Sequence, residues 1–171
     1  MGLLRGRGEE QQRRRFQMGE KLLSIGDDFW IEDEAGNRAY RVDGKAVRLR
    51  ETFVLEDASG REVAEIQERK LSIRDKMAIE RDGETVATVH KALVGIRDRF
   101  AIDVEGGEDL KAKGNIVDHE YEIERDGKTI ATISKRWFRV RDTYGVELAP
   151  SEDEGLLLSA VVALESLTDR G

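Results

Sequence analysis

Hydrophobic and polar residues alternate with a period of two along most of this chain. Side chains in a β-strand point alternately to opposite faces, so this alternation predicts strands with one apolar and one polar face. The predicted apolar face carries Ala64, Ile66, Ala87, Val89, Ala131 and Ile133. The predicted polar face carries Glu65, Gln67, Thr88, His90, Thr132 and Ser134. We expect the first set to line a core and the second set to face outward.

The alternating pattern recurs as an internal repeat. Met77–Val104 matches Tyr121–Leu148 without a gap at an offset of 44 residues. Phe53–Ile79 and Phe29–Leu55 follow the same plan, and Phe100–Ile123 is a degenerate fifth unit. Self-similarity of this kind indicates one structural unit used several times. Each unit is predicted to be a strand, a glycine turn and a second strand.

Turn residues separate the two strands of each unit. The tripeptide Arg-Asp-Gly occurs at 81–83 and 125–127 between β-branched runs, where glycine supplies the positive φ of a tight hairpin. Gly36, Gly60 and the pair at 106–107 mark the other turns. Five units give about ten strands, and the segments at 14–18 and 28–32 bring the total to about twelve.

The C-terminal segment has a different pattern, because its apolar residues cover every direction of a helical wheel. These residues are Leu156, Leu157, Leu158, Val161, Val162, Leu164 and Leu167. A helix that is apolar all round must be surrounded by protein. Ser151 and Glu154 have capping-box spacing, so the helix is predicted over about 151–168. The fold predicted is mainly β, a closed antiparallel barrel around this helix.

Composition and charge narrow the classes of function. The 171 residues suit one domain, and the absence of cysteine excludes disulfides and thiol chemistry and fits a reducing cytoplasm. Met1–Arg15 carries five arginines and two glutamates and is predicted to be a disordered basic tail before a barrel domain at 16–171. The net charge of −7 then leaves −10 for the barrel, which disfavours nucleic acid. We expect no secretory signal, transmembrane segment or cofactor, and a monomer.

Several motifs resemble the LURP-one-related family. They are KLLSIGDDFWIED (Lys21–Asp33), KAVRLRETFVLED (Lys45–Asp57), HKALVGIRDRFAIDVEGGEDL (His90–Leu110), KGNIVDHEYEIERDG (Lys113–Gly127) and SKRWFRVRDTYGVEL (Ser134–Leu148). The resemblance implies the tubby-like fold, twelve strands around a central hydrophobic C-terminal helix. The wider tubby-like group includes phosphoinositide-binding tubby proteins and membrane-acting phospholipid scramblases. Neither group's site motif occurs in this sequence, so the resemblance implies a lipid ligand only at the level of the fold.

One candidate site is a set of carboxylates that recurs at strand starts. Asp75, Asp98 and Asp142 each follow an arginine and fall on the predicted apolar face. Inward carboxylates need partners. One interpretation is that they accept hydrogen bonds from nearby turns or arginines. The alternative is an oxygen-rich ring that holds a hard cation.

A second candidate site lies where two repeat units differ most. Lys135, Arg136, Trp137, Phe138 and Arg139 replace Lys91-Ala92-Leu93-Val94-Gly95 of the sister unit, which places three cations and two aromatic rings in one connection. Such a loop suits an anionic headgroup or phosphate. The structural alternative is that the rings close the barrel and the cations are solvated.

The sequence contains no catalytic signature. His90 and His119 lack the spacing of a metal site, and no phosphate loop or nucleophile elbow occurs. We therefore expect a non-enzymatic, cytoplasmic binding or scaffold domain, peripheral at the membrane if its ligand is a phospholipid headgroup. The predicted anion-binding residues are Lys135, Arg136, Trp137 and Arg139. The competing hypothesis is a structural or protein-interaction domain without a small ligand.

Overall fold

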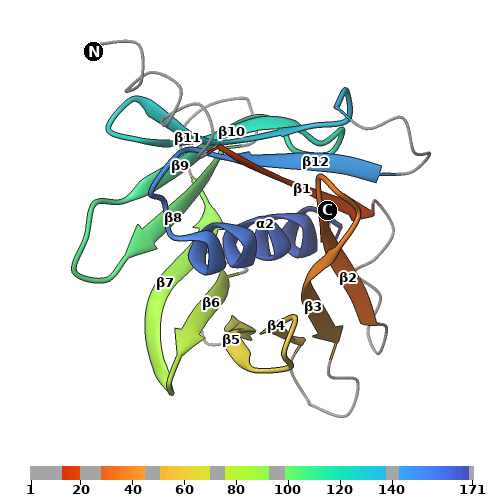
Figure 1. Cartoon of the computed structure of the whole chain (residues 1–171). Helices are drawn as coiled ribbons and strands as arrows, with labels where there is room; N and C mark the ends of the chain where they lie inside the picture. The colour runs from red at the N-terminus through yellow and green to blue at the C-terminus, as the bar shows by residue number, and fades with distance from the viewer. Residues whose placement is uncertain are drawn as a thin grey trace, which may run out of the picture.

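Twelve antiparallel strands close into one barrel in the computed structural model of the chain, and a helix lies inside it (Figure 1). The structure describes residues 13–19, 28–44, 51–69, 76–92, 99–137 and 143–169. The strands are β1 (Arg14–Gly19), β2 (Asp28–Asp33), β3 (Arg38–Gly44), β4 (Thr52–Asp57), β5 (Glu62–Arg69), β6 (Lys76–Arg81), β7 (Glu84–Lys91), β8 (Phe100–Val104), β9 (Leu110–Asn115), β10 (Glu120–Arg125), β11 (Lys128–Ser134) and β12 (Thr143–Leu148). The helix is α2 (Glu154–Asp169).

The strands follow one another around the barrel in sequence order, and β1 pairs with β12 to close it. Closure removes the unpaired edges that an open sheet of this length would expose. The predicted closed barrel of about twelve strands is therefore confirmed. Strand β1 begins at Arg14, where a strand was predicted at 14–18, so Arg14 and Arg15 belong to the sheet although they were also included in the predicted basic tail.

The hairpins turn at the predicted glycines. In the two Arg-Asp-Gly turns, Asp82 and Gly83 have φ of 51° and 79°, and Asp126 and Gly127 have 50° and 75°. Two successive residues with positive φ form the turn type whose twist matches a right-handed β-hairpin. Register shifts in β2, β4, β6 and β10 mark a bulge beside four of the hairpin turns.

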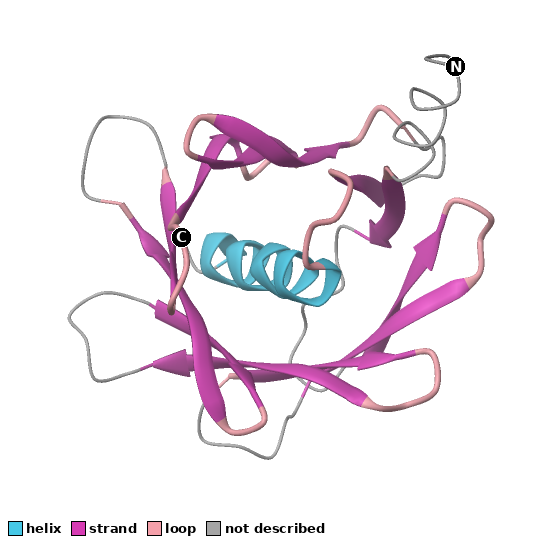
Figure 2. Ribbon diagram, turned by 60° about the vertical axis from the view of Figure 1, so that its left-hand side comes forward, coloured by secondary structure: helices cyan, strands magenta, loops and turns pink. Residues whose placement is uncertain are grey.

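The inner face of the barrel carries the predicted apolar residues. Ala64, Ile66, Ala87, Val89, Ala131 and Ile133 are all buried. Helix α2 fills the space between these walls, and Figure 2 shows strands on all sides of it. Leu157, Leu158, Val162 and Ala163 point in different directions around the helix, yet each is at most 1% exposed. The prediction that a helix apolar all round must be surrounded is confirmed.

The start of α2 differs from the prediction. The helix begins at Glu154, and the side chain of Asp153 accepts a hydrogen bond from the backbone N–H of Leu156 at 3.1 Å. This is the geometry of an N-cap residue and the third helical residue. Ser151 has φ of 65° and precedes the helix, so the predicted capping box of Ser151 and Glu154 is wrong. Asp153 caps the helix in place of Ser151, because the chain turns at Ser151 before the helix begins.

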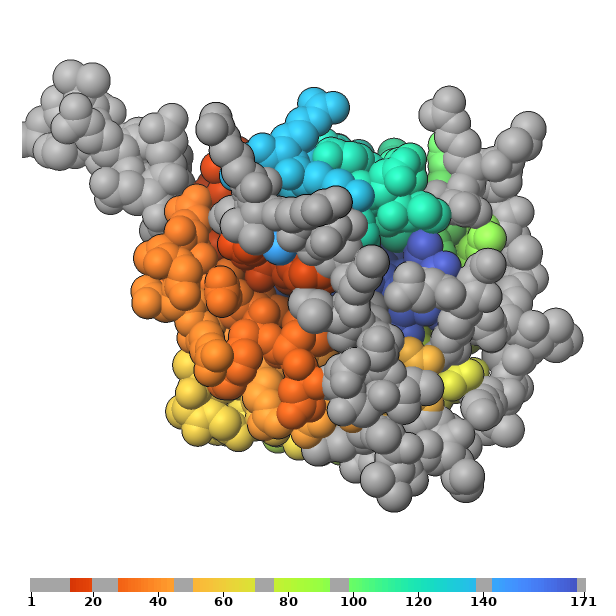
Figure 3. All heavy atoms as spheres, turned by 90° about the vertical axis from the view of Figure 1, so that its right-hand side faces the viewer, coloured from red at the N-terminus to blue at the C-terminus, as the bar shows by residue number. Residues whose placement is uncertain are grey.

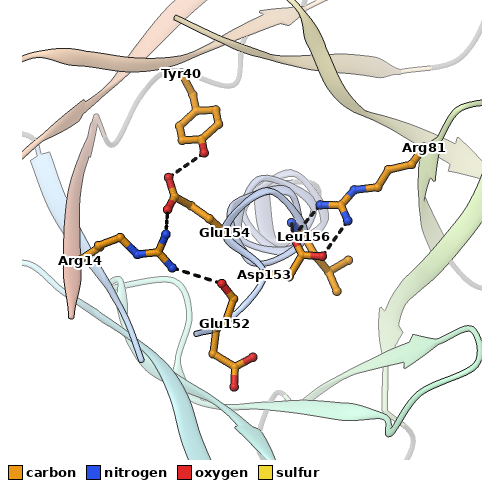
Figure 4. A network of polar contacts seen from close by, with 7 residues as sticks. All are labelled: Arg14, Tyr40, Arg81, Glu152, Asp153, Glu154 and Leu156. Carbon is orange, nitrogen blue, oxygen red and sulfur yellow. Dashed lines mark hydrogen bonds and ion pairs between the residues drawn. The ribbon is translucent and has the colours of Figure 1, made fainter. Parts of the chain in front are cut away.

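Arginines from three strands bind the acidic residues at this entrance, as Figure 4 shows for two of them. Arg81 of β6 donates two hydrogen bonds of 2.7 Å to Asp153. Arg125 of β10 donates two to Glu152, at 2.8 and 3.0 Å. Arg14 of β1 binds Glu154, which also accepts a 2.6 Å hydrogen bond from Tyr40. The network ties the helix start to opposite sides of the barrel.

The ion pair between Arg81 and Asp153 should make the stability of the fold depend on pH. The hydrogen bonds from Arg81 hold the pKa of Asp153 below its usual value. Protonation is therefore harder in the folded state, so the pair stabilises the fold above about pH 4 and this contribution is lost as the pH falls further. We expect Asp153→Asn, which keeps an N-cap acceptor, to be less stable than the natural protein at pH 7. Urea unfolding should show the difference shrinking towards pH 3.

The matched control is Asp126→Asn in the β10–β11 turn. Asp126 is exposed and has no ion pair among the described residues. Its substitution should leave the stability at pH 7 nearly unchanged. A loss at Asp153 that persists undiminished at pH 3 would contradict the role assigned to its charge.

Candidate functional site

The predicted basic connection lies partly within the described residues. Lys135, Arg136 and Trp137 follow β11 directly, and Arg136 is exposed whereas Trp137 is half-buried. Arg139 lies outside the described residues. Asp75, Asp98 and Asp142, the alternative carboxylate set, lie outside them too.

Glu120 of β10 fixes the path of this connection as it leaves the sheet. One carboxylate oxygen of Glu120 accepts 3.0 Å hydrogen bonds from the Ser134 hydroxyl and from the backbone N–H of Lys135. The Ser134 hydroxyl oxygen accepts a further bond of 3.2 Å from the backbone N–H of Arg136. Ser134 is consequently buried although it points outward from the barrel. The first turn of the connection is thus held by three hydrogen bonds.

Trp137 is held against β1 by an arginine. The guanidinium carbon of Arg15 lies 5.0 Å from the centre of the Trp137 ring, within the range of a cation–π contact. Arg15 also donates a 2.6 Å hydrogen bond to Glu147 of β12, and Arg13 donates one of 3.2 Å to the same carboxylate. Two cations therefore share one close anion.

Arg13, Arg15, Arg136 and Trp137 form what we call the Arg-Trp surface. The guanidinium of Arg136 has no partner among the described residues, and Glu34 lies 3.9 Å from Arg15 as a distant, exposed counter-charge. The surface carries more positive than negative charge on a protein whose net charge is −7. Sequence reasoning found Arg136 and Trp137, but it missed Arg13 and Arg15 because only the β1–β12 pairing brings them here.

A cavity of about 830 Å³ lies beside the Arg-Trp surface, and we call it the β9–β11 cavity. Its lining includes Arg99, Lys113, Val117, Glu120, Glu122 and Thr132. Gly114 also lines it, and a Cβ atom there would lie 2.7 Å from the backbone oxygen of Glu120. The missing side chain therefore lets β9 and β10 approach closely and leaves room at the surface.

The register of the sheet connects the cavity to the Arg-Trp surface. Lys113 pairs with Glu122, Glu122 with Thr132, Thr132 with Glu147, and Glu147 with Arg15. Paired residues lie on the same face of a sheet. The cavity and the Arg-Trp surface are thus two parts of one outer wall, and Glu120 of the cavity lining binds Ser134 and Lys135, directly before Arg136. Figure 3 shows the end of β11, in sky blue, between β1 in red and the teal strands β9 and β10.

The two histidines have structural partners. His90 points outward as predicted, and its Nε2 lies 2.8 Å from a carboxylate oxygen of Asp103 on the neighbouring strand. His119 is buried, lies parallel to the Tyr144 ring at 4.3 Å, and places Nδ1 3.0 Å from Glu165 of α2. Tyr121 also donates to Glu165, and burial raises the pKa of its hydroxyl well above the usual value.

The cluster around His119 was missed from sequence. A signal was available, because Glu165 interrupts the apolar residues of α2 and therefore needs a polar partner inside the barrel. Over the described part of the chain, His, Asp and Glu side chains form no group of three suited to a metal ion. Among the same residues, no helix is long and apolar enough to span a membrane.

The chain is similar in sequence to one protein family and in fold to a solved structure. The family model described as LURP-one-related matches residues 14–165. An X-ray structure of a protein from Arabidopsis thaliana is 18% identical, with a TM-score of 0.69 over 91% of this chain and 91% of that chain. At this identity the likeness concerns the fold alone. No curated protein matches the sequence.

Proposed function

Since the chain belongs to the LURP-one-related family, we propose that it is a non-enzymatic binding domain that recognises anionic phospholipid through its Arg-Trp surface. The observation that carries the proposal is the stacking of Arg15 on Trp137 beside the exposed Arg136. Tryptophan is favoured at the boundary between lipid and water, and arginine forms charge-assisted hydrogen bonds with phosphate oxygens.

Electrostatics supports an anionic partner at this surface. Arg13 and Arg15 share the carboxylate of Glu147, and the exposed Glu34 lies 3.9 Å from Arg15, so these four groups nearly cancel. Arg136 supplies the net positive charge of the surface. Each basic residue near an anionic membrane contributes about 1 kcal/mol, so a few such groups give weak and reversible attachment. Under this proposal the protein is cytoplasmic and attaches to the membrane peripherally.

The proposal predicts a charge-dependent loss of binding. Arg136→Glu changes the local charge by two units, which should cost about 2 kcal/mol and weaken binding to anionic vesicles about 30-fold. The substitution breaks no side-chain contact among the described residues, so the melting temperature should stay nearly constant. Co-sedimentation with phosphatidylcholine vesicles containing phosphatidylglycerol, at low and moderate salt, measures the effect.

Arg61→Glu is the matched control for charge. Arg61 is exposed in the β4–β5 turn and lies outside both the Arg-Trp surface and the cavity. The same change in net charge at Arg61 should leave vesicle binding within about threefold of the natural protein, because charges beyond a Debye length are screened. Equal losses in the two variants, or no binding by the natural protein, would sink the proposal.

A further inference from the structure

Glu147 of β12 lies among the arginines of the Arg-Trp surface. Its carboxylate accepts a 2.6 Å hydrogen bond from Arg15 and a 3.2 Å hydrogen bond from Arg13. The side chain of Glu147 is only 15% exposed, whereas the side chains of Arg15 and Arg13 are 41% and 63% exposed. The carboxylate is therefore the least exposed of the three charged groups. Both arginines keep solvent-facing area that a lipid phosphate can reach.

The sheet fixes Glu147 in this position. Glu147 pairs with Arg15 of β1 on one side and with Thr132 of β11 on the other, so all three side chains share the outer face of the barrel. Salt screens a partly buried charge less than an exposed one, such as that of Glu34. Glu147 is thus a counter-charge built into the wall beneath the arginines.

From this arrangement we propose that Glu147 determines specificity for membrane charge, by setting the density of anionic lipid that the protein requires. Attraction to a membrane grows with the charge of the protein surface and with the surface potential of the lipid. Glu147 offsets one of the two arginine charges, so the remaining attraction is sufficient only at densely charged membranes. This inference rests on the proposed function, because it concerns the surface that binds the lipid.

A purely positional role for Glu147 gives the opposite expectation. In that role the carboxylate holds Arg15 against the Trp137 ring, and loss of its charge loosens the contact and weakens lipid binding. Under the proposal, the stack on Trp137 and the pairing of β1 with β12 keep Arg15 in place without the charge. The sign of the change in affinity therefore separates the two roles.

The test is Glu147→Gln in the full chain, which removes one negative charge and keeps a hydrogen-bond acceptor for the arginines. Natural protein and variant are sedimented with phosphatidylcholine vesicles that contain increasing fractions of phosphatidylglycerol. Release of about one arginine charge should tighten binding about fivefold at a fixed fraction. Half-maximal binding should then need a lower fraction of phosphatidylglycerol, and the melting temperature should stay close to that of the natural protein.

Two control variants isolate the local charge. Glu147→Asp keeps the charge on a shorter side chain, so it should show no gain in binding. Glu80→Gln removes a similarly exposed carboxylate that binds Arg69 on β6, at the opposite side of the barrel. It changes the net charge of the protein by the same amount and should leave binding within about twofold, because charges beyond a Debye length are screened.

The possible outcomes separate the two proposals. Unchanged or weaker binding by Glu147→Gln overturns the role of Glu147 and leaves lipid binding by the Arg-Trp surface standing. An equal gain in Glu80→Gln or in Glu147→Asp overturns that role too, because the gain would not come from the charge at this position. Failure of both the natural protein and Glu147→Gln to bind vesicles of pure phosphatidylglycerol overturns the proposed function, and this inference with it.

Discussion

Replacing Gly114 with alanine is expected to cost about 3 to 5 kcal/mol of folding free energy. Gly114 has φ of 125°, a conformation that residues with a Cβ rarely adopt. The added Cβ would also lie 2.7 Å from the Glu120 oxygen and 2.9 Å from the Tyr121 Cα, both backbone atoms. The melting temperature should fall by roughly 10 °C.

Gly127→Ala is the control that separates the cost of backbone strain from the cost of a steric clash with the neighbouring strand. Gly127 also has a positive φ, 75°, but a Cβ there would meet nothing within 4 Å. Strain alone should cost about 1 to 2 kcal/mol. Urea unfolding of the two variants gives both values in one experiment. Similar losses would mean that the close approach of β9 and β10 at Gly114 does not exist in solution.

Truncating either Leu158 or Leu167 to alanine is expected to cost about 2 to 5 kcal/mol. The two residues are two and a half helical turns apart, so they point to opposite sides of α2, and both side chains are buried. A helix packed on the outside of a sheet would tolerate one of these two substitutions. A helix enclosed by a barrel tolerates neither, so the pair of measurements tests enclosure directly.

Val117→Ala serves as the comparison for Leu158 and Leu167. Val117 is 64% exposed, so its truncation should change the free energy of unfolding by less than about 0.5 kcal/mol. A small effect at either leucine, comparable with that at Val117, would contradict the central position of α2.

The fold was predictable because its signals are local and recur. Alternation identified the inward residues, such as Ala87 and Val89, and the two Arg-Asp-Gly turns fixed the ends of two hairpins. The all-round apolar helix then required a surrounding wall. The start of that helix was predicted less well, because Ser151 and Asp153 both have capping chemistry. The choice between them depends on where the chain turns after β12.

The candidate site was predictable only where the sequence departs from its own repeat. Arg136 and Trp137 were found in this way, but Arg15 reaches Trp137 only because the first and last strands pair. The partners of Arg81 and Arg125 lie in a segment remote in sequence, Glu152–Asp153. Such contacts depend on register and closure, which composition and periodicity do not specify. The cavity was missed for the same reason, since it depends on how Gly114 lies against β10.

The most direct test of membrane binding is the fluorescence of Trp137 in the single-tryptophan variant Trp30→Phe. Trp137 belongs to the proposed contact surface, so its emission should shift to shorter wavelength and iodide should quench it less when anionic vesicles are added. Neutral vesicles should leave both properties unchanged. Unchanged emission and quenching, while the variant sediments with anionic vesicles, would show that another surface binds the lipid.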